Sequence, residues 1–84
     1  MSHVPDADRE LVARCRHGEE TAFDTLYSRY RLPLYSYLGR LLPGRAALVD
    51  DLFQQTWINA LEHLSRYREQ QRFLAWLFRI AHNL

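Results

Sequence analysis

Residues 50–64 read DDLFQQTWINALEHL, and residues 72–84 read RFLAWLFRIAHNL. The first stretch spaces its apolar residues as a helix does, but it has more of them than one buried stripe requires. Acids and amides lie beside this excess. The second stretch mixes the same period with arginine, tryptophan and asparagine. Two such helices in succession indicate a protein that binds another protein with one helix and nucleic acid with the next.

The composition limits the fold to one small domain. A chain of 84 residues, 48% of them hydrophobic, is long enough for a single packed core. Three glycines and three prolines are too few for the many turns of an all-β fold. No apolar run approaches the roughly 18 residues of a membrane span, and the first ten residues lack the pattern of a signal peptide. The single Cys15 cannot form an internal disulfide, and a free thiol fits the reducing cytoplasm.

We therefore expect an all-α fold, a compact bundle of about five helical segments. A flexible N-terminus is expected over residues 1–7 and a helical domain over residues 8–84. Asp6 or Asp8 can cap the first helix, and Gly18 is placed to end it. The helices are expected to run from about residue 8 to 17, from 19 or 21 to 33, from 34 to 42, from 46 to 64, and from 71 to the end.

Two signals divide the central part of this pattern. Pro33 should break or kink the second helix, because proline lacks an N–H and clashes with the preceding turn. The pair Pro43-Gly44 is a strong stop before the fourth helix.

The fourth expected helix has two apolar sides. Its core stripe consists of Val49, Leu52, Phe53, Thr56, Ala60 and Leu64. The apolar residues off this stripe are Trp57, Ile58 and Leu61, and they share their side with Asp51, Gln54, Gln55 and Glu62. This side either packs on a neighbouring helix or binds a partner protein, with Trp57 as its apolar anchor.

The last helix also carries two rows. The row expected to point inward is Phe73, Leu77, Ile80 and Leu84. A second row contains Arg72, Trp76, Arg79 and Asn83. Arginine neutralises phosphate, tryptophan offers a stacking plane and asparagine can read a base edge, so this row can hold a nucleic-acid strand. Tyr67 and Phe73 add rings near its start. The alternative is a solvated arginine face with Trp76 folded into the core.

Charge is unevenly distributed along the chain. Residues 1–63 carry seven arginines and nine acids, a net charge of −2, whereas residues 64–84 carry four arginines and one acid, a net charge of +3. The chain has no lysine, which a codon bias toward arginine would explain equally well. Codon bias does not explain why the positive charge gathers at the C-terminal end, where it favours contact with phosphate.

These stretches resemble region two (domain 2) of bacterial RNA polymerase sigma factors, and most of all the extracytoplasmic-function class. The similarity rests on DDLFQQTWINALEHL followed by FLAWLFRIAHNL, and on the opening ELVARCRHGEETAFDTLYSRY. It covers the chain from about residue 8 to residue 84. The combination of D-x-x-Q-x-x-W with F-x-A-W-L-F-R-I-A-x-N is specific, whereas neither piece alone would be.

The resemblance implies two interfaces and a function in transcription initiation. The fourth helix would dock on the clamp helices of the β′ subunit of core RNA polymerase, through Asp51, Gln54, Gln55, Trp57, Ile58 and Leu61. The connection and the last helix would recognise and melt the promoter minus-ten element and hold its non-template strand. The DNA-binding residues carried over are Arg66, Tyr67, Arg68, Arg72, Phe73, Trp76, Arg79, His82 and Asn83. The family also implies an anti-sigma factor as a partner.

The chain departs from the family pattern at three points. The family usually has glycine or serine just before the Phe-x-x-Trp segment, where this chain reads REQQRF, and it often has arginine at the position of His82. The connection helps to shape the base pocket, so the base preference is open. Family members continue to a second helical domain, region four, which is absent here. We expect the chain to be a piece of a longer protein.

Other functional classes have weaker signals. No catalytic triad, carboxylate pair or glycine-rich phosphate loop is present, so we predict no enzyme, no catalytic residue and no cofactor. Cys15 and His17 could supply two metal ligands, but the other histidines are scattered and no metal site is predicted. The remaining alternative is a helical adaptor or regulator-binding module that does not bind DNA.

Overall fold

The computed structural model describes residues 5–67 and 72–84, and it describes side chains from Asp8 onward within these ranges. Within them the chain forms four α-helices, one 3-10 helix and no strand. The elements are α1 (Pro5–Arg16), α2 (Glu20–Leu41), α3 (Ala46–Glu62), η1 (Leu64–Arg66) and α4 (Phe73–His82). The predicted all-α class is confirmed.

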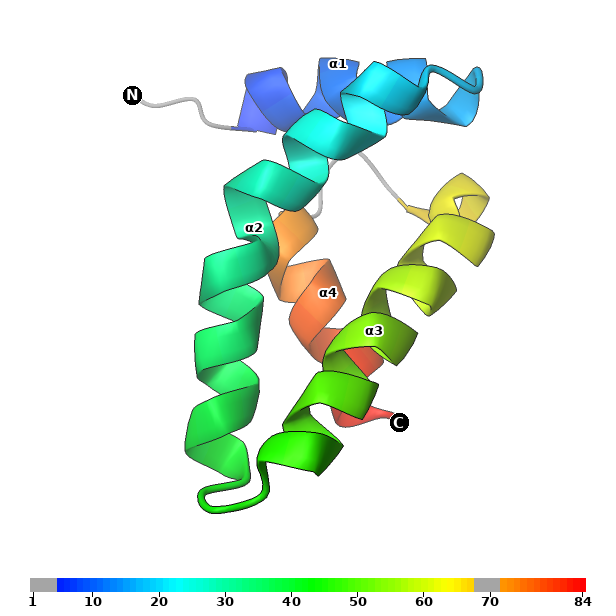
Figure 1. The fold of residues 1–84 in the computed structure, drawn as a ribbon. Coiled ribbons are helices and arrows are strands. Elements are labelled where there is room, and N and C mark those ends of the chain that lie inside the picture. The colour runs from blue at the N-terminus through cyan, green and yellow to red at the C-terminus, as the bar shows by residue number, and fades with distance from the viewer. Residues whose placement is uncertain (1–4, 68–71) are drawn as a thin grey trace.

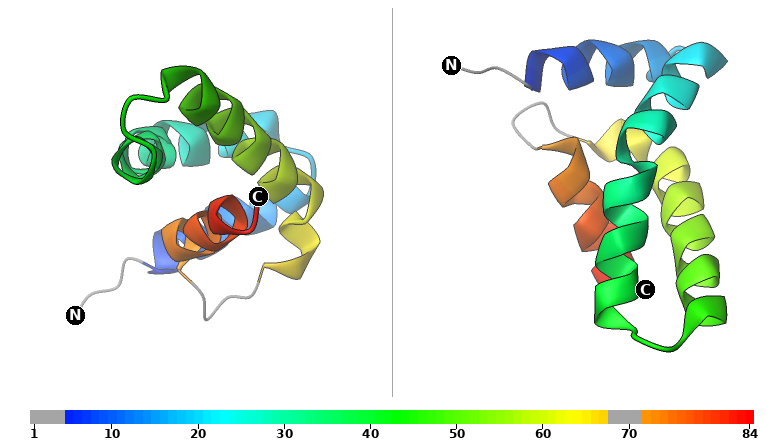
Figure 2. Two further views of the ribbon diagram at one scale, coloured as in Figure 1. Left: turned by 90° about the horizontal axis from the view of Figure 1, so that it is seen from below. Right: turned by 60° about the vertical axis from the view of Figure 1, so that its left-hand side comes forward.

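The helices form a bundle closed at one end (Figure 1). Helices α2 and α3 run in opposite directions and join at a short tip. Helix α4 contacts both, and it runs in the same direction as α2. Helix α1 lies across the end of the bundle away from the tip, where it contacts α2 and η1 (Figure 2). No helix in the described ranges is both long enough and apolar enough to cross a membrane.

Of the predicted break or kink at Pro33, the break does not occur, because helix α2 is continuous through this residue. Leu26, Leu34 and Leu38, on both sides of the proline, are buried in the same core and hold the helix together across it. Pro33 itself is exposed. It can donate no hydrogen bond to the carbonyl of Arg29, and water can take that place on the exposed side. The part of the chain that the structure describes therefore has four α-helices and η1, where about five helical segments were expected.

The helix ends differ slightly from the predicted ones. Helix α1 already begins at Pro5, so the predicted boundary after residue 7 falls inside a helix, while residues 1–4 lie outside the described ranges. Helix α3 ends at Glu62 because the chain tightens into η1. Helix α4 begins at Phe73, and residue 71, where it was expected to start, is not described. Gly18, with φ 88°, takes the left-handed conformation that ends α1.

Every helix contributes to one core. The buried apolar residues are Leu11, Val12, Ala22, Leu26, Leu34, Leu38, Val49, Trp57, Ala60, Leu64, Tyr67, Phe73, Trp76, Leu77 and Ala81. The predicted stripe of α3 is confirmed, since all six of its members are buried or half-buried. Of the predicted inward row of α4, Phe73 and Leu77 are buried and Ile80 is half-buried. Leu84 lies beyond the helix end and is exposed, so the prediction is wrong for this residue.

A buried carboxylate ties α1 to α2. Asp8 is only 3% exposed. Its carboxylate accepts a hydrogen bond from the Tyr30 hydroxyl and another from Nη1 of Arg29 at 2.9 Å. Asp8 is therefore an inter-helix contact of α1 and not its cap. Burial, and then the nearby Asp8 carboxylate, raise the pKa of Tyr30 above its ordinary value, so the phenol stays a donor.

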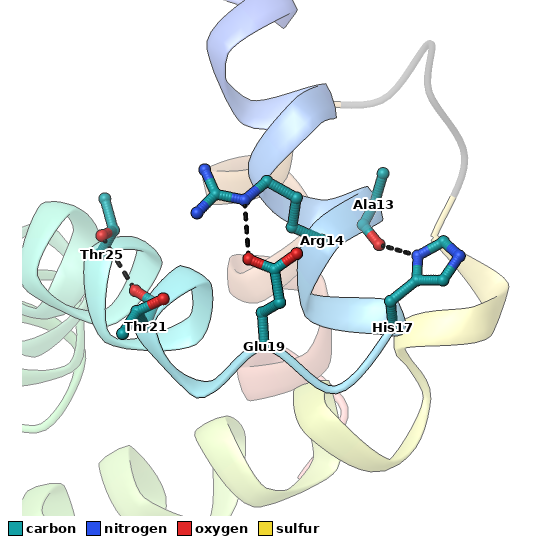
Figure 3. A network of polar contacts seen from close by, with 6 residues as sticks. All are labelled: Ala13, Arg14, His17, Glu19, Thr21 and Thr25. Atoms are coloured by element: carbon teal, nitrogen blue, oxygen red, sulfur yellow. Dashed lines mark hydrogen bonds and ion pairs between the residues drawn. The ribbon is translucent and has the colours of Figure 1, made fainter.

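The turn between α1 and α2 is held by exposed polar contacts (Figure 3). Nε of Arg14 donates to Oε1 of Glu19 at 3.0 Å, and Nδ1 of His17 donates to the Ala13 carbonyl at 2.8 Å. Both partners of the ion pair are more than 40% exposed. Water and salt screen such a pair, so it contributes little to stability.

Replacing Asp8 with alanine is expected to lower the free energy of unfolding by about 2–4 kcal/mol, because it leaves the Tyr30 hydroxyl and the Arg29 guanidinium without their acceptor. Urea denaturation followed by circular dichroism measures the change. Glu19→Ala, which removes an exposed ion pair, is the matched control and should cost less than about 1 kcal/mol. Equal losses for the two variants would contradict the assignment of Asp8 as a buried clamp.

Candidate functional site

The outer face of α3 presents five of the six residues predicted to bind a protein. Asp51, Gln54, Gln55, Ile58 and Leu61 are exposed, and their spacing places them along one side of the helix. Ile58 is 48% exposed and Leu61 is 50% exposed, which is high for large apolar side chains. Acid and amide groups therefore occupy the beginning of this face, and apolar groups its end. We call these five residues the α3 face.

The polar groups of the α3 face differ in how much of their bonding capacity is free. Gln55 donates through Nε2 to Oδ1 of Asn59 at 2.8 Å, one turn further along the helix. Asp50, next to the face, accepts a hydrogen bond from the Tyr35 hydroxyl at 2.7 Å and so belongs to the contact between α2 and α3. Asp51 and Gln54 make no side-chain hydrogen bond within the described ranges, so both can bind a partner.

The prediction that Trp57 anchors this face is wrong, because its indole is buried. Trp57 is 5% exposed, and its ring lies 5.8 Å from Phe23 and 5.1 Å from Tyr27, both on α2. It also contacts Phe53 on its own helix and Phe73 on α4. Position 57 lies at the edge of the core stripe, and the aromatic side chains of α2 extend the core over it. The indole Nε1 is buried and has no hydrogen-bond acceptor within the described ranges.

The predicted DNA-binding row of α4 divides into exposed and buried residues. Arg72, Arg79 and Asn83 are exposed, whereas Trp76 is 7% exposed and packs against Tyr67 at 5.2 Å and Phe73 at 5.6 Å. The alternative interpretation, with Trp76 in the core, is therefore the one observed. The expectation that Trp76 offers an open stacking plane is wrong.

The rings of Tyr67 and Phe73 are also buried, at 5% and 2% exposure, and contact each other at 5.5 Å. They flank the start of α4 as predicted, but with their faces turned into the core. Burial raises the pKa of Tyr67, and the Asp8 carboxylate adds to this rise. Arg16 and Arg9 act in the opposite direction. The rings of Tyr67 and Phe73 are therefore part of the core beneath the surface of α4.

The other predicted DNA-binding residues lie around the same helix. Arg66 in η1 and His82 at the end of α4 are exposed. Arg68 lies outside the described ranges. Within the described ranges no cluster of three potential metal ligands is found.

A shallow hollow of about 270 Å³ lies between α3 and α4. Its lining consists of Asn59, His63, Arg66, Trp76, Ile80, Asn83 and Leu84. Amide groups, an imidazole and a guanidinium thus surround an apolar floor, which suits a flat group with polar edges, such as an unpaired nucleobase. Among the predicted DNA-binding residues, this hollow brings together Arg66, Trp76 and Asn83.

Sequence reasoning missed Asn59 and His63. Asn59 lies on α3 and His63 directly follows its last residue, and Nδ1 of His63 lies 2.9 Å from the Asn59 carbonyl oxygen. The side-chain oxygen of Asn59 accepts from Gln55, so its amide nitrogen remains able to donate. The i, i+4 spacing of two polar residues was the available signal. Their meeting with Asn83 depends on how α4 packs against α3, which the spacing alone does not give.

Known proteins match this chain in sequence and in structure. The family described as sigma-70 region 2 matches residues 26–84. The ECF RNA polymerase sigma factor BldN of Streptomyces coelicolor is 40% identical over 76 residues, which are 89% of this chain and 28% of that protein. The ECF RNA polymerase sigma-E factor of Escherichia coli K12 is 36% identical over 76 residues, which are 90% of this chain and 39% of that protein.

A solved structure gives a similar result. The nuclear magnetic resonance structure of an engineered region 2 of sigmaE, in complex with GTAAAA, matches with a TM-score of 0.77 and 34% sequence identity. The match covers 90% of this chain and 78% of that one. In contrast, the chain spans well under half the length of the two full-length relatives.

Neighbouring residues of α3 provide a test of the corrected site. Trp57→Ala should lower the free energy of unfolding by about 3–5 kcal/mol, because it opens a cavity among the rings of three helices. Ile58→Ala, on the exposed side of the same turn, should change it by no more than about 0.5 kcal/mol. Thermal and urea denaturation would measure both variants. Similar losses of stability in the two variants would contradict the placement of Trp57 in the core.

Proposed function

We propose that this chain, which belongs to the sigma-70 region 2 family and to its ECF class, binds core RNA polymerase. We also propose that it recognises and melts the promoter minus-ten element. The named relatives are ECF sigma factors, and the similar solved structure is an engineered region 2 of sigmaE in complex with GTAAAA. The observation that carries the proposal is that α3 and α4 pack against each other and each has an exposed face. The face of α3 combines acidic, amide and apolar groups, whereas the exposed side of α4 carries arginine. The proposed function needs no catalytic group.

The α3 face is the proposed contact with polymerase, through the clamp helices of the β′ subunit. Its exposed apolar residues, Ile58 and Leu61, would form the centre of an interface, and Asp51, Gln54 and Gln55 would give directional contacts around them. Trp57 has an indirect role in this proposal. Its buried ring holds α3 against α2 and so fixes which side of α3 remains exposed.

The α4 side is the proposed contact with the non-template strand. Arg66, Arg72, Arg79 and His82 are exposed and would lie along the phosphates, and Asn83 would contact a base edge at the hollow between α3 and α4. Arg68 is included in the proposal from the family resemblance alone. Tyr67, Phe73 and Trp76 are proposed to act as the rigid support of this surface, because their rings are buried.

Melting follows from preference for the unpaired strand. Removing a base from the stack costs a few kcal/mol, and contacts available only to the single strand can offset that cost. The hollow of about 270 Å³ would accept part of an unpaired base, while the arginines hold the backbone on either side. Such a surface shifts the equilibrium of the duplex toward opening.

A regulator is the further partner in this proposal. Exposed apolar residues on α3 would attract an anti-sigma factor as well as polymerase, so the two would compete for Ile58 and Leu61. This function also requires the chain to act where polymerase and promoter DNA are present, the bacterial cytoplasm.

Replacing Asp51 or Gln54 with alanine should weaken binding to core polymerase by about 1–2 kcal/mol each, because a directional contact at the rim of the apolar centre is lost. Thermal stability should stay nearly unchanged, since both side chains are exposed. Titration of each variant against core polymerase measures the effect. Glu10→Ala, an exposed acid on α1, is the control for charge. Wild-type affinity in both α3 variants would contradict the proposed polymerase face.

The DNA assignment separates two kinds of contact. Arg79→Ala should weaken binding to all single strands and reduce the slope of log affinity against log salt by about one phosphate unit. Asn83→Ala should instead change the preference at one base position, by about 1–3 kcal/mol. Fluorescence anisotropy with minus-ten-like oligonucleotides, scanned base by base at several salt concentrations, distinguishes the two patterns.

Arg14→Ala is the control for the DNA experiment, because it removes one exposed positive charge from α1, outside the proposed surface. If Arg79→Ala and Asn83→Ala bind every strand as the control does, the DNA assignment is wrong. The chain would then be better described as a helical adaptor that binds proteins alone.

A further inference from the structure

Arg16, the last residue of α1, contacts a segment much later in the chain. Its Nε donates a hydrogen bond to the carbonyl oxygen of Leu64 at 3.2 Å, and its Nη2 donates to the carbonyl oxygen of Tyr67. These acceptors are 48 and 51 residues further along. One is the first residue of η1 and the other is the residue directly after it. A single guanidinium thus holds both ends of this short helix.

The chemistry of Arg16 suits this contact. The planar guanidinium donates from two nitrogens at a fixed angle, so it can join two carbonyl groups, which a lysine ammonium does less well. Backbone carbonyl oxygens carry partial negative charge, and hydrogen bonds that a charged guanidinium donates to them are stronger than those from a neutral donor. Within the described ranges Arg16 has no carboxylate partner, and both hydrogen bonds of its side chain go to the backbone of this segment. Arg14, in contrast, pairs with Glu19 at the α1–α2 turn (Figure 3).

The backbone that Arg16 holds carries Arg66. This residue lies between the two tethered carbonyls, is exposed, and lines the hollow between α3 and α4 together with Asn83. Tyr67, at the far end of the tether, packs its ring against Phe73 and Trp76 at the start of α4. The direction of the Arg66 side chain therefore depends on a turn that is fixed from α1 on one side and from α4 on the other.

We infer that Arg16 is a positioning residue for DNA binding, which fixes η1 so that Arg66 is directed to a strand at the hollow between α3 and α4. The inference rests on the proposed function, since it assigns Arg66 to the single strand. Arg16 itself does not contact DNA. With Arg16 replaced, the carbonyl of Tyr67 loses its charged donor, the turn gains freedom, and Arg66 must be ordered when the strand binds.

A double-mutant cycle tests whether Arg16 acts through Arg66. The affinity of the 84-residue chain for a fluorescent minus-ten-like single strand is measured for the wild type, Arg16→Ala, Arg66→Ala and the double variant. The temperature is one at which circular dichroism shows all four to be folded. Arg66→Ala should weaken binding about three- to tenfold, and Arg16→Ala about two- to fivefold. In the Arg66→Ala background the further effect of Arg16→Ala should fall below about 1.5-fold.

Two variants serve as controls. Arg14→Ala removes the same charge from the same last turn of α1, and it should leave the affinity within about 1.5-fold of the wild type, because the Arg14 side chain pairs with Glu19. Arg16→Lys keeps the charge but not the two-nitrogen fork, so its affinity should lie between those of the wild type and Arg16→Ala. If Arg16→Ala does not fold, the cycle is carried out with Arg16→Lys.

The outcomes separate this inference from the proposed function. If Arg66→Ala weakens binding but Arg16→Ala does not, Arg16 has no positioning role and the proposed function stands. The same holds if the loss caused by Arg16→Ala is undiminished in the Arg66→Ala background, because Arg16 would then contact DNA itself or act only on stability. If the wild type binds no strand, or Arg66→Ala binds as well as the wild type, the assignment of Arg66 to DNA is wrong and this inference is overturned with it.

Discussion

The ring of Phe73 contacts four other aromatic rings, and these come from different parts of the chain. The centroid of the Phe73 ring lies 5.5 to 6.3 Å from those of Tyr30 on α2, Trp57 on α3, Trp76 on α4 and Tyr67. At 2% exposure Phe73 is enclosed by them. Aromatic packing of this kind is directional as well as apolar, because tilted and edge-on pairs are preferred. The start of α4 is therefore fixed at once against two helices and against Tyr67, the residue after η1. The outward direction of Arg72, Arg79 and Asn83 follows from it.

The consequence for function is that the aromatic residues and the charged residues have different roles. The rings of Tyr67, Phe73 and Trp76 are enclosed in the core, so they give the surface its rigidity and offer little open face to a base. Recognition then depends on arginine and amide groups at the surface and on the hollow between α3 and α4. A rigid support limits how much freedom these long side chains lose when they bind. The α3 face meets this region along α3 itself, because Gln55 of the face donates to Asn59, which lines the hollow.

Helical periodicity made much of this predictable from the sequence. The core stripe of α3 and the exposure of Asp51, Gln54 and Gln55 follow from spacing within one helix, where position decides which side a residue faces. Trp57 could not be assigned in this way, because its burial depends on Phe23 and Tyr27, about thirty residues earlier. Pro33 was predicted from its local chemistry to break or kink a helix, and the packing of α2 along the core keeps the helix continuous through it. Contacts between distant segments, such as those of Arg16, leave no periodic signal.

The bonds that join α1 to later residues also set an order of assembly. Asp8 needs partners 21 and 22 residues further along, and Arg16 needs backbone groups 48 and 51 residues further along. During synthesis on the ribosome α1 emerges before all of them. It can fold locally as a helix, yet it cannot complete its contacts until η1 has left the exit tunnel. Contacts at long sequence separation form slowly, because the intervening chain must first be brought together. A helix that is synthesised before its partners thus becomes one of the last to be fully held in place.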